Sequence, residues 1–84
     1  MSTNITIFST SICAICEAEI KWFDKKGVSY DHIVVDESDQ GMEQFMQATG
    51  GIIQSPPFTV IKKADGSEVK VAGFDMKKLT SAIS

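Results

Sequence analysis

The two cysteines of the chain, Cys13 and Cys16, stand where a β-strand pattern changes into a helical pattern. Residues 3–8 alternate apolar and polar side chains, which is typical of a short central strand. Residues 14–26 repeat apolar side chains at helical spacing. Two residues between the cysteines is about one helical turn, so both sulfurs lie at the same end of that helix, within bonding reach. The fold must therefore present a strand-to-helix junction that carries two thiols.

Composition limits the kinds of protein that this chain can be. Its 84 residues suit one domain, and 43% hydrophobic with 23% charged residues is ordinary globular composition. The net charge is −3 and the sequence has no arginine, so a nucleic-acid partner would lack its usual basic surface. No apolar run approaches the roughly 20 residues needed to span a bilayer. We therefore expect a cytoplasmic protein with no membrane and no nucleic-acid partner.

The helix over residues 14–26 has clear signals at its end and a mixed apolar face. Lys25 and Lys26 lie near the negative pole of the helix, and Gly27 can adopt the left-handed cap. The apolar side chains fall into one row and a second row beside it: Ile15, Ala18 and Trp22, then Cys16, Ile20 and Phe23.

The remaining elements follow from composition and turn signals. Residues 28–35 predict a strand that pairs in parallel with the first through a right-handed crossover. A second helix begins at a cap on Asp36, Ser38 or Asp39 and runs to about Ala48. Residues 58–62 and 68–72 predict a hairpin around the turn at 64–67, followed by a last helix over about 75–83. The predicted order is βαβαββα.

This order, with a Cys-x-x-Cys motif where the first strand meets the first helix, resembles the thioredoxin fold. That resemblance implies an α/β domain with a four-stranded mixed sheet and helices on both faces. At this length the chain resembles a glutaredoxin, or a glutaredoxin-like redoxin of the type that serves ribonucleotide reductase. Three segments carry the likeness, and we interpret residues 1–84 as a single glutaredoxin-like domain: Cys13-Ala14-Ile15-Cys16, Ser55-Pro56-Pro57 and Ala72-Gly73-Phe74-Asp75.

The position of the cysteines predicts their chemical roles. Cys13 lies at the first turn of the helix, where unpaired amide groups and the positive helix pole stabilise a thiolate, so we expect a lowered thiol pKa. Glu17 follows at i+4 and no cation precedes Cys13 in the loop, so the lowering should be moderate. Cys13 is the predicted nucleophile, which forms a mixed disulfide with the target. Cys16 then attacks that disulfide and releases the reduced target.

The proline segment carries a second set of expectations, which rest on the resemblance. Thioredoxin-fold proteins have a cis-proline that faces the nucleophile, and the residue before it pairs its backbone with the substrate. We favour the Ser55–Pro56 bond as the cis bond, because a cis-Pro57 would be preceded by Pro56, which has no amide hydrogen to donate. Pro57 remains the alternative. Ser55 and Pro56 are therefore predicted to bind substrate.

Further substrate-binding residues also come from the resemblance. Gly73 and Phe74 correspond to the turn beside the active site. Asp75 matches the aspartate with which glutaredoxins hold glutathione, although it can equally be the N-cap of the last helix. Thr10 occupies the place of the lysine that glutaredoxins carry three residues before the first cysteine. A main anchor for a glutathione carboxylate is therefore missing.

The predicted function is a monomeric thiol–disulfide oxidoreductase that reduces protein disulfides, with ribonucleotide reductase as a candidate target. It would need no tightly bound cofactor, and its reductant would be glutathione, as a co-substrate, or a thioredoxin-reductase-type flavoprotein. The alternative is an iron–sulfur carrier that shares a cluster between two chains through Cys13. A zinc site is disfavoured because only His32, expected to be a surface or edge histidine, could join the two cysteines.

Overall fold

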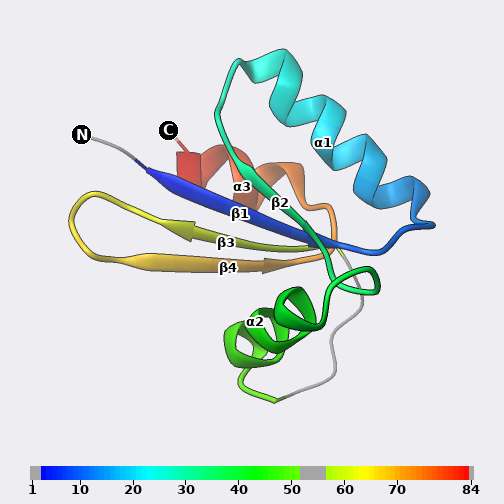
Figure 1. Ribbon diagram of the computed structural model, residues 1–84. Helices are drawn as coiled ribbons and strands as arrows, with labels where there is room; N and C mark the ends of the chain where they lie inside the picture. The colour runs from blue at the N-terminus through cyan, green and yellow to red at the C-terminus, as the bar shows by residue number, and fades with distance from the viewer. Residues whose placement is uncertain (1–2, 52–56, 84) are drawn as a thin grey trace.

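A four-stranded mixed sheet with strand order β2-β1-β3-β4 forms the centre of the molecule (Figure 1). The computed structural model describes residues 3–51 and 57–83. The elements in chain order are β1 (Asn4–Ser9), α1 (Ala14–Lys26), β2 (Asp31–Val34), α2 (Asp39–Thr49), β3 (Phe58–Lys62), β4 (Glu68–Ala72) and α3 (Met76–Ile83).

The pairing of the strands confirms the predicted thioredoxin topology. β1 pairs in parallel with β2 and antiparallel with β3, and β3 pairs antiparallel with β4. Helices α1 and α3 pack on one face of the sheet and α2 packs on the other (Figure 1). The site-bearing junction between β1 and α1 therefore lies at the carboxyl end of an inner strand.

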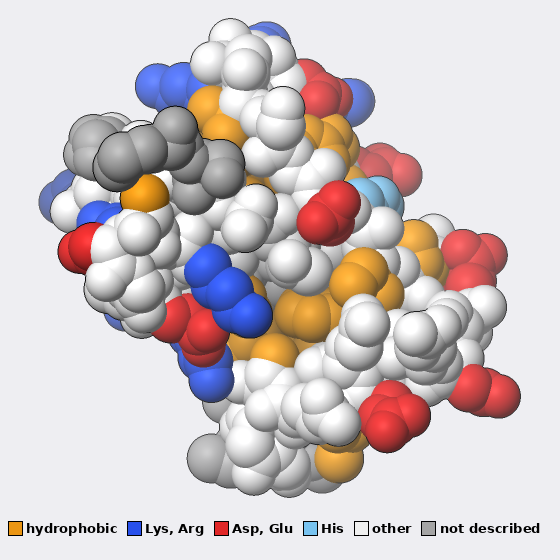
Figure 2. Space-filling view, turned by 60° about the vertical axis from the view of Figure 1, so that its left-hand side comes forward, with side chains coloured by type: hydrophobic (Ala, Val, Ile, Leu, Met, Phe, Trp, Pro, Cys, Tyr) orange, Lys and Arg blue, Asp and Glu red, His pale blue; other side chains and the backbone are white. Residues whose placement is uncertain are grey.

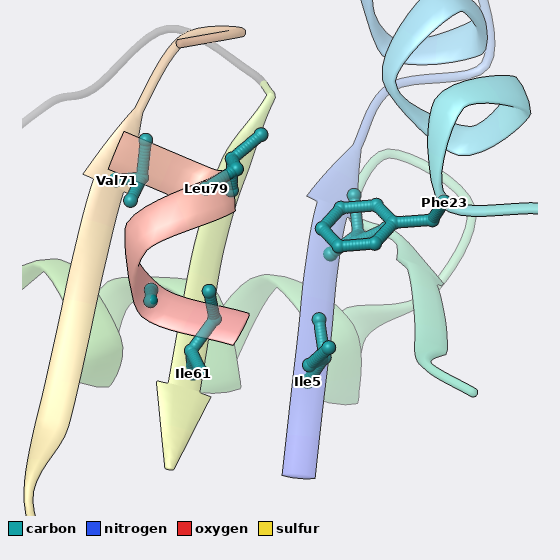
Figure 3. Packing of buried hydrophobic residues seen from close by; sticks show 7 residues of the cluster. Ile5, Phe23, Ile61, Val71 and Leu79 are labelled. Carbon is teal, nitrogen blue, oxygen red and sulfur yellow. The ribbon is translucent and has the colours of Figure 1, made fainter. Parts of the chain in front are cut away.

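Side-chain alternation along β1 and β3 fills two separate cores. The face under α1 and α3 holds the larger one, which we call the α1/α3 core (Figure 3): Ile5, Ile7, Phe23, Ile61, Val71, Leu79 and Ala82. Phe23 reaches from α1 and Leu79 from α3 toward the sheet (Figure 3). The opposite face packs against α2 through Phe8, Val35, Phe45, Phe58 and Val60. Both faces of the inner strands are thus buried, which holds β1 firmly beneath the cysteines.

Local sequence signals account for the ends of the helices. Gly27 and Gly50 have φ of 69° and 70° and form the left-handed C-caps of α1 and α2. Ser38 is the N-cap of α2, with its hydroxyl accepting a hydrogen bond from the Gly41 amide at 3.0 Å. Of the three caps that the sequence left open, the structure uses Ser38.

One sequence-based expectation needs correction, and the structure settles which apolar row of α1 is buried. The second strand is shorter than the predicted 28–35, because Val28 and Tyr30 pack against the α1/α3 core without pairing in the sheet. Of the two apolar rows predicted on α1, the one with Cys16 and Phe23 faces the interior, whereas Ile15 in the other row is 58% exposed. The buried residues of α1 are Cys16, Glu19 and Phe23. A buried glutamate on a core face is invisible to a pattern that counts only apolar side chains.

The α1/α3 core gives a direct test of the fold with a matched pair of isoleucines. Ile61 is fully buried, whereas Ile12 is 93% exposed. Ile61→Ala should lower the free energy of unfolding by about 3 kcal/mol, because it removes buried methyl groups and leaves a cavity. Ile12→Ala should change it by less than about 0.5 kcal/mol. Urea denaturation of both variants measures the difference, and equal losses would contradict the packing described here.

Candidate active site

Cys13 is the N-cap of α1, directly before the first helical residue. Its backbone is extended, with φ −157° and ψ 100°. The Cys16 amide donates a hydrogen bond to Cys13 Sγ at 3.1 Å, and the Glu17 amide donates to the Cys13 carbonyl at 3.1 Å. The sulfur therefore lies at the amide end of the helix, where negative charge is stabilised.

The two cysteines form a disulfide whose Cα atoms are 5.2 Å apart. Cys13 is half-buried, whereas Cys16 is only 1% exposed. A reagent from solvent therefore meets Cys13 first. This asymmetry matches the predicted order of a nucleophile followed by a more buried partner.

The loop between β1 and α1 is tied to the end of β2. The Val35 amide donates to the Ser9 carbonyl at 2.9 Å. Ser11 then donates twice to Asp36, from its amide to Oδ1 at 2.9 Å and from its hydroxyl to Oδ2 at 2.6 Å. Thr10, one of the predicted substrate-binding residues, donates from its hydroxyl to the Ile12 carbonyl at 3.3 Å. These contacts set the path by which the chain enters Cys13.

A small open cavity borders both cysteines, and we call it the cysteine cavity. It has a volume of about 190 Å³ and is lined by Ser9, Thr10, Ser11, Cys13, Cys16, Glu17, Ile20, His32, Val34 and Glu37. The described residues of this lining include two carboxylates and one histidine but no lysine. The side of the site that faces β2 therefore offers no fixed positive charge to an anionic ligand.

His32 and Glu37 line this cavity, which no pattern in the sequence indicated. His32 is exposed on the edge strand β2, as expected, and its Nε2 shares a hydrogen bond with the buried Ser9 hydroxyl. The parallel register, which pairs Ile7 with His32, brings the histidine toward the cysteines. The register between β1 and β2 could be predicted from the sequence only if the first residue of β2 were known.

The predicted turn at residues 73–75 lies beside the start of β3. Gly73 has φ 79°, and its amide donates to the Pro57 carbonyl at 2.8 Å. Phe74 is half-buried and packs edge-on against Trp22, with ring centroids 6.2 Å apart. The predicted residues Ser55 and Pro56, and with them the choice of cis bond, lie outside the described residues.

Asp75 is the N-cap of α3 in the structure. Its Oδ1 accepts a hydrogen bond from the Lys78 amide at 3.1 Å, and its carbonyl accepts from the Leu79 amide at 2.9 Å. The capping role that the sequence left open is therefore present. One oxygen of the carboxylate is already used within the protein.

Behind the cysteines, Glu19 is a fully buried carboxyl group. It is 0% exposed, and its Oε2 accepts a hydrogen bond from the Thr59 hydroxyl at 2.6 Å. Its Oε1 has no hydrogen-bond partner in the described part of the chain. Burial raises the pKa of Glu19, and the Thr59 hydrogen bond partly opposes that rise. The only sequence signal for Glu19 is that it lies three residues after Cys16 and four before Phe23.

A larger cavity lies elsewhere. It measures about 740 Å³ and opens between the sheet and α2, with Phe8, Val60 and Ala48 among its apolar walls and Lys62 and Lys70 at its rim. Figure 2 shows this hollowed face with hydrophobic side chains at its floor. Neither cysteine lines it. Reactive groups and their ordered contacts identify the site better than volume does, so we place the candidate active site at the cysteines.

Within residues 3–51 and 57–83, no group of three or more histidine, cysteine, aspartate or glutamate side chains is arranged to hold a metal ion. None of the helices in that part of the chain has the length and apolar character to cross a membrane.

The fold and the site together define a thioredoxin-fold protein with a redox-capable Cys-x-x-Cys pair at the β1–α1 junction. The glutaredoxin family profile matches residues 5–62, which is more than half of the chain. The protein therefore belongs to the glutaredoxin family. No curated protein sequence is significantly similar to it.

Several solved structures share the fold over nearly their whole length. The thioredoxin-like protein BC3987 is 22% identical with a TM-score of 0.74, covering 93% of this chain and 97% of its own. A glutaredoxin from Archaeoglobus fulgidus is 20% identical with a TM-score of 0.71, covering 94% and 84%. The glutaredoxin-like protein NrdH-redoxin from Escherichia coli is 22% identical with a TM-score of 0.70, covering 93% and 92%. At these identities the likeness establishes the fold.

The Ser11–Asp36 contact predicts a measurable acid dependence. The hydrogen bond from the Ser11 hydroxyl is the main cause that lowers the pKa of Asp36 below its ordinary value of 3.8. A carboxyl whose pKa is lower in the folded state stabilises the fold above its unfolded pKa, and this contribution is lost as the pH falls through the folded pKa. Ser11→Ala should therefore raise the pKa of Asp36, and Ser11→Thr, which keeps a hydroxyl, should not. Carboxyl-carbon NMR titration measures both, and an unchanged pKa in Ser11→Ala would show that the contact does not form.

Proposed function

We propose that this protein reduces disulfide bonds in protein substrates by dithiol exchange at Cys13 and Cys16. The observation that carries the proposal is the placement of Cys13 Sγ at the N-terminus of α1, where it accepts the Cys16 amide hydrogen. A helix N-terminus lowers the pKa of a cysteine thiol and so supplies the thiolate that disulfide exchange requires. Family membership supports the same class of reaction.

The proposed reaction has two exchange steps. The Cys13 thiolate attacks one sulfur of the target disulfide, forming the Cys13–target bond and releasing the other target sulfur as a thiolate. Cys16 then attacks Cys13 Sγ, which forms the internal disulfide and releases the second target thiolate. The target gains two electrons and the cysteine pair loses two. The disulfide in the structure corresponds to the oxidised product of this cycle.

The surface around the cysteines suits a polypeptide better than a small anion. Ile12 and Ile15 flank Cys13 in the chain and are 93% and 58% exposed. Exposed apolar side chains beside a reactive group can be buried against a protein partner. The cysteine cavity has Thr10 and two carboxylates in its lining and no lysine, so it offers no cation to pair with the two carboxylates of glutathione. We therefore propose protein disulfides as the substrates, with ribonucleotide reductase as the candidate target.

The reductant is proposed on the same grounds. The lysine that would bind a glutathione carboxylate is absent, because Thr10 occupies its place. Asp75 is engaged in capping α3. The structural relative from Escherichia coli is described as a glutaredoxin-like protein with a thioredoxin-like activity profile. These points favour a thioredoxin-reductase-type flavoprotein as the electron donor, with glutathione as the alternative co-substrate.

A pair of coupled assays tests the function and its electron donor. NADPH oxidation is followed with insulin as the acceptor, once with thioredoxin reductase and once with glutathione plus glutathione reductase. We expect turnover in the first assay and much less in the second. Turnover only with glutathione would overturn the proposed donor but keep the reaction, whereas turnover in neither assay, with freshly reduced protein, would overturn the reaction.

Cysteine variants assign the two chemical roles in the same assay. Cys13→Ser should abolish turnover because it removes the nucleophile. Cys16→Ser should stop after the first step and leave a covalent Cys13–target adduct, which mass spectrometry of the acid-quenched mixture detects. An adduct that forms through Cys16 in the Cys13→Ser protein, at the rate seen for Cys13, would reverse the assignment.

A further inference from the structure

The buried face of α1 places a carboxyl group one helical turn behind Cys16. Glu19 follows Cys16 by three residues, and residues three apart share one face of a helix with Cβ atoms about 5–6 Å apart. Both residues are in the interior, at 1% and 0% exposure. Helical side chains lean toward the N-terminus of their helix, so Glu19 leans toward the turn that carries Cys16.

The contacts of Glu19 leave one of its oxygens available for proton transfer. Thr59 Oγ1 donates to Oε2 from strand β3, and Thr59 belongs to the same sheet face as Ile61 and the α1/α3 core. Oε1 has no partner within the described residues. An unpaired buried carboxyl oxygen is unfavourable for folding, and replacing this side chain by an apolar one would avoid that penalty.

The second exchange step needs a proton acceptor near Cys16. A thiol must lose its proton before it attacks, and a side chain that is 1% exposed has little access to bulk water. We propose that Glu19 is the general base that takes the Cys16 proton, directly or through one water molecule, when the mixed disulfide is resolved. This inference rests on the proposed dithiol exchange.

The proton balance closes over one catalytic cycle. The Glu19 carboxylate accepts the Cys16 proton, the Cys16 thiolate bonds to Cys13, and the target sulfur leaves as a thiolate that solvent protonates. When the reductant later attacks Cys13, Cys16 leaves as a thiolate and recovers its proton from Glu19. The oxidised protein therefore carries a protonated Glu19 before each reduction, which suits a carboxyl whose pKa burial raises.

Other titratable groups face the same cysteines and must be separated from Glu19. Glu17 from α1, His32 from β2 and Glu37 from the segment after β2 line the cysteine cavity on the solvent side. Glu19 lies one helical turn from Cys16 on the buried face of α1, where its described polar partner is Thr59 on β3. A base in the cavity would respond to substitutions there, and a base in the core would not.

The experiment measures the second step alone. Fully reduced protein is mixed with a peptide that contains one disulfide, the reaction is quenched with acid at successive times, and mass spectrometry follows the Cys13–peptide adduct. Glu19→Gln keeps the side-chain size and an oxygen that can accept from Thr59, so it should fold. In this variant the adduct should form at the normal rate and resolve about a hundredfold more slowly, the low end of what general-base catalysis contributes.

The pH profile distinguishes a general base from a structural role. The Thr59 hydroxyl lowers the pKa of Glu19, so Thr59→Val should move the midpoint of the resolution rate to higher pH. Glu19→Gln should remove that ionisation from the profile. His32→Asn and Glu37→Gln report on the cavity side. If either of these slows resolution while Glu19→Gln does not, or if Glu19→Gln keeps the wild-type rate and profile, the proposal is wrong. Failure of the wild-type protein to form any adduct would instead overturn the proposed function.

Discussion

The hydrogen bond from the Cys16 amide to Cys13 Sγ is the contact on which the proposed chemistry depends. It exists because α1 begins at Ala14, so that Cys13 is the cap and its sulfur meets the unpaired amide groups of the first turn. The start of α1 is in turn held by β1, which is buried on both faces, and by the ties from Ser9 and Ser11 to the end of β2. The sheet and the loop thus position one sulfur atom.

Much of this arrangement could be predicted from the sequence, because local signals and topology agree. The bounds of α1 and of both hairpin strands match the prediction, since each element is ended by a glycine or a turn with a definite backbone preference, such as Gly27. The predicted length of β2 was wrong because the side chains of Val28 and Tyr30 pack against the α1/α3 core, while their backbone does not pair in the sheet. The start of α2 stayed open because three neighbouring side chains can all cap a helix.

The parts of the site that the sequence missed are those that depend on contacts across the sheet. His32 reaches the cysteine cavity through the β1–β2 register, and Glu19 meets Thr59 forty residues away through the packing of α1 on β3. Neither contact follows from periodicity. The result is a cysteine pair between two polar environments: an open cavity with carboxylates and a histidine toward solvent, and one buried carboxyl group toward the core. The first has no lysine in its lining for an anionic ligand, and the second is the group proposed to take the Cys16 proton.

The central claim is that Cys13 is the nucleophile and Cys16 the resolving cysteine. Thiol alkylation of the reduced protein tests it most directly. A limiting amount of iodoacetamide near neutral pH, followed by peptide mass spectrometry, gives the modified fraction of each cysteine. The half-buried, helix-terminal Cys13 should react much faster than Cys16, which is 1% exposed in the structure. Equal labelling of the two residues, or preferential labelling of Cys16, would contradict the assignment of Cys13 as the nucleophile.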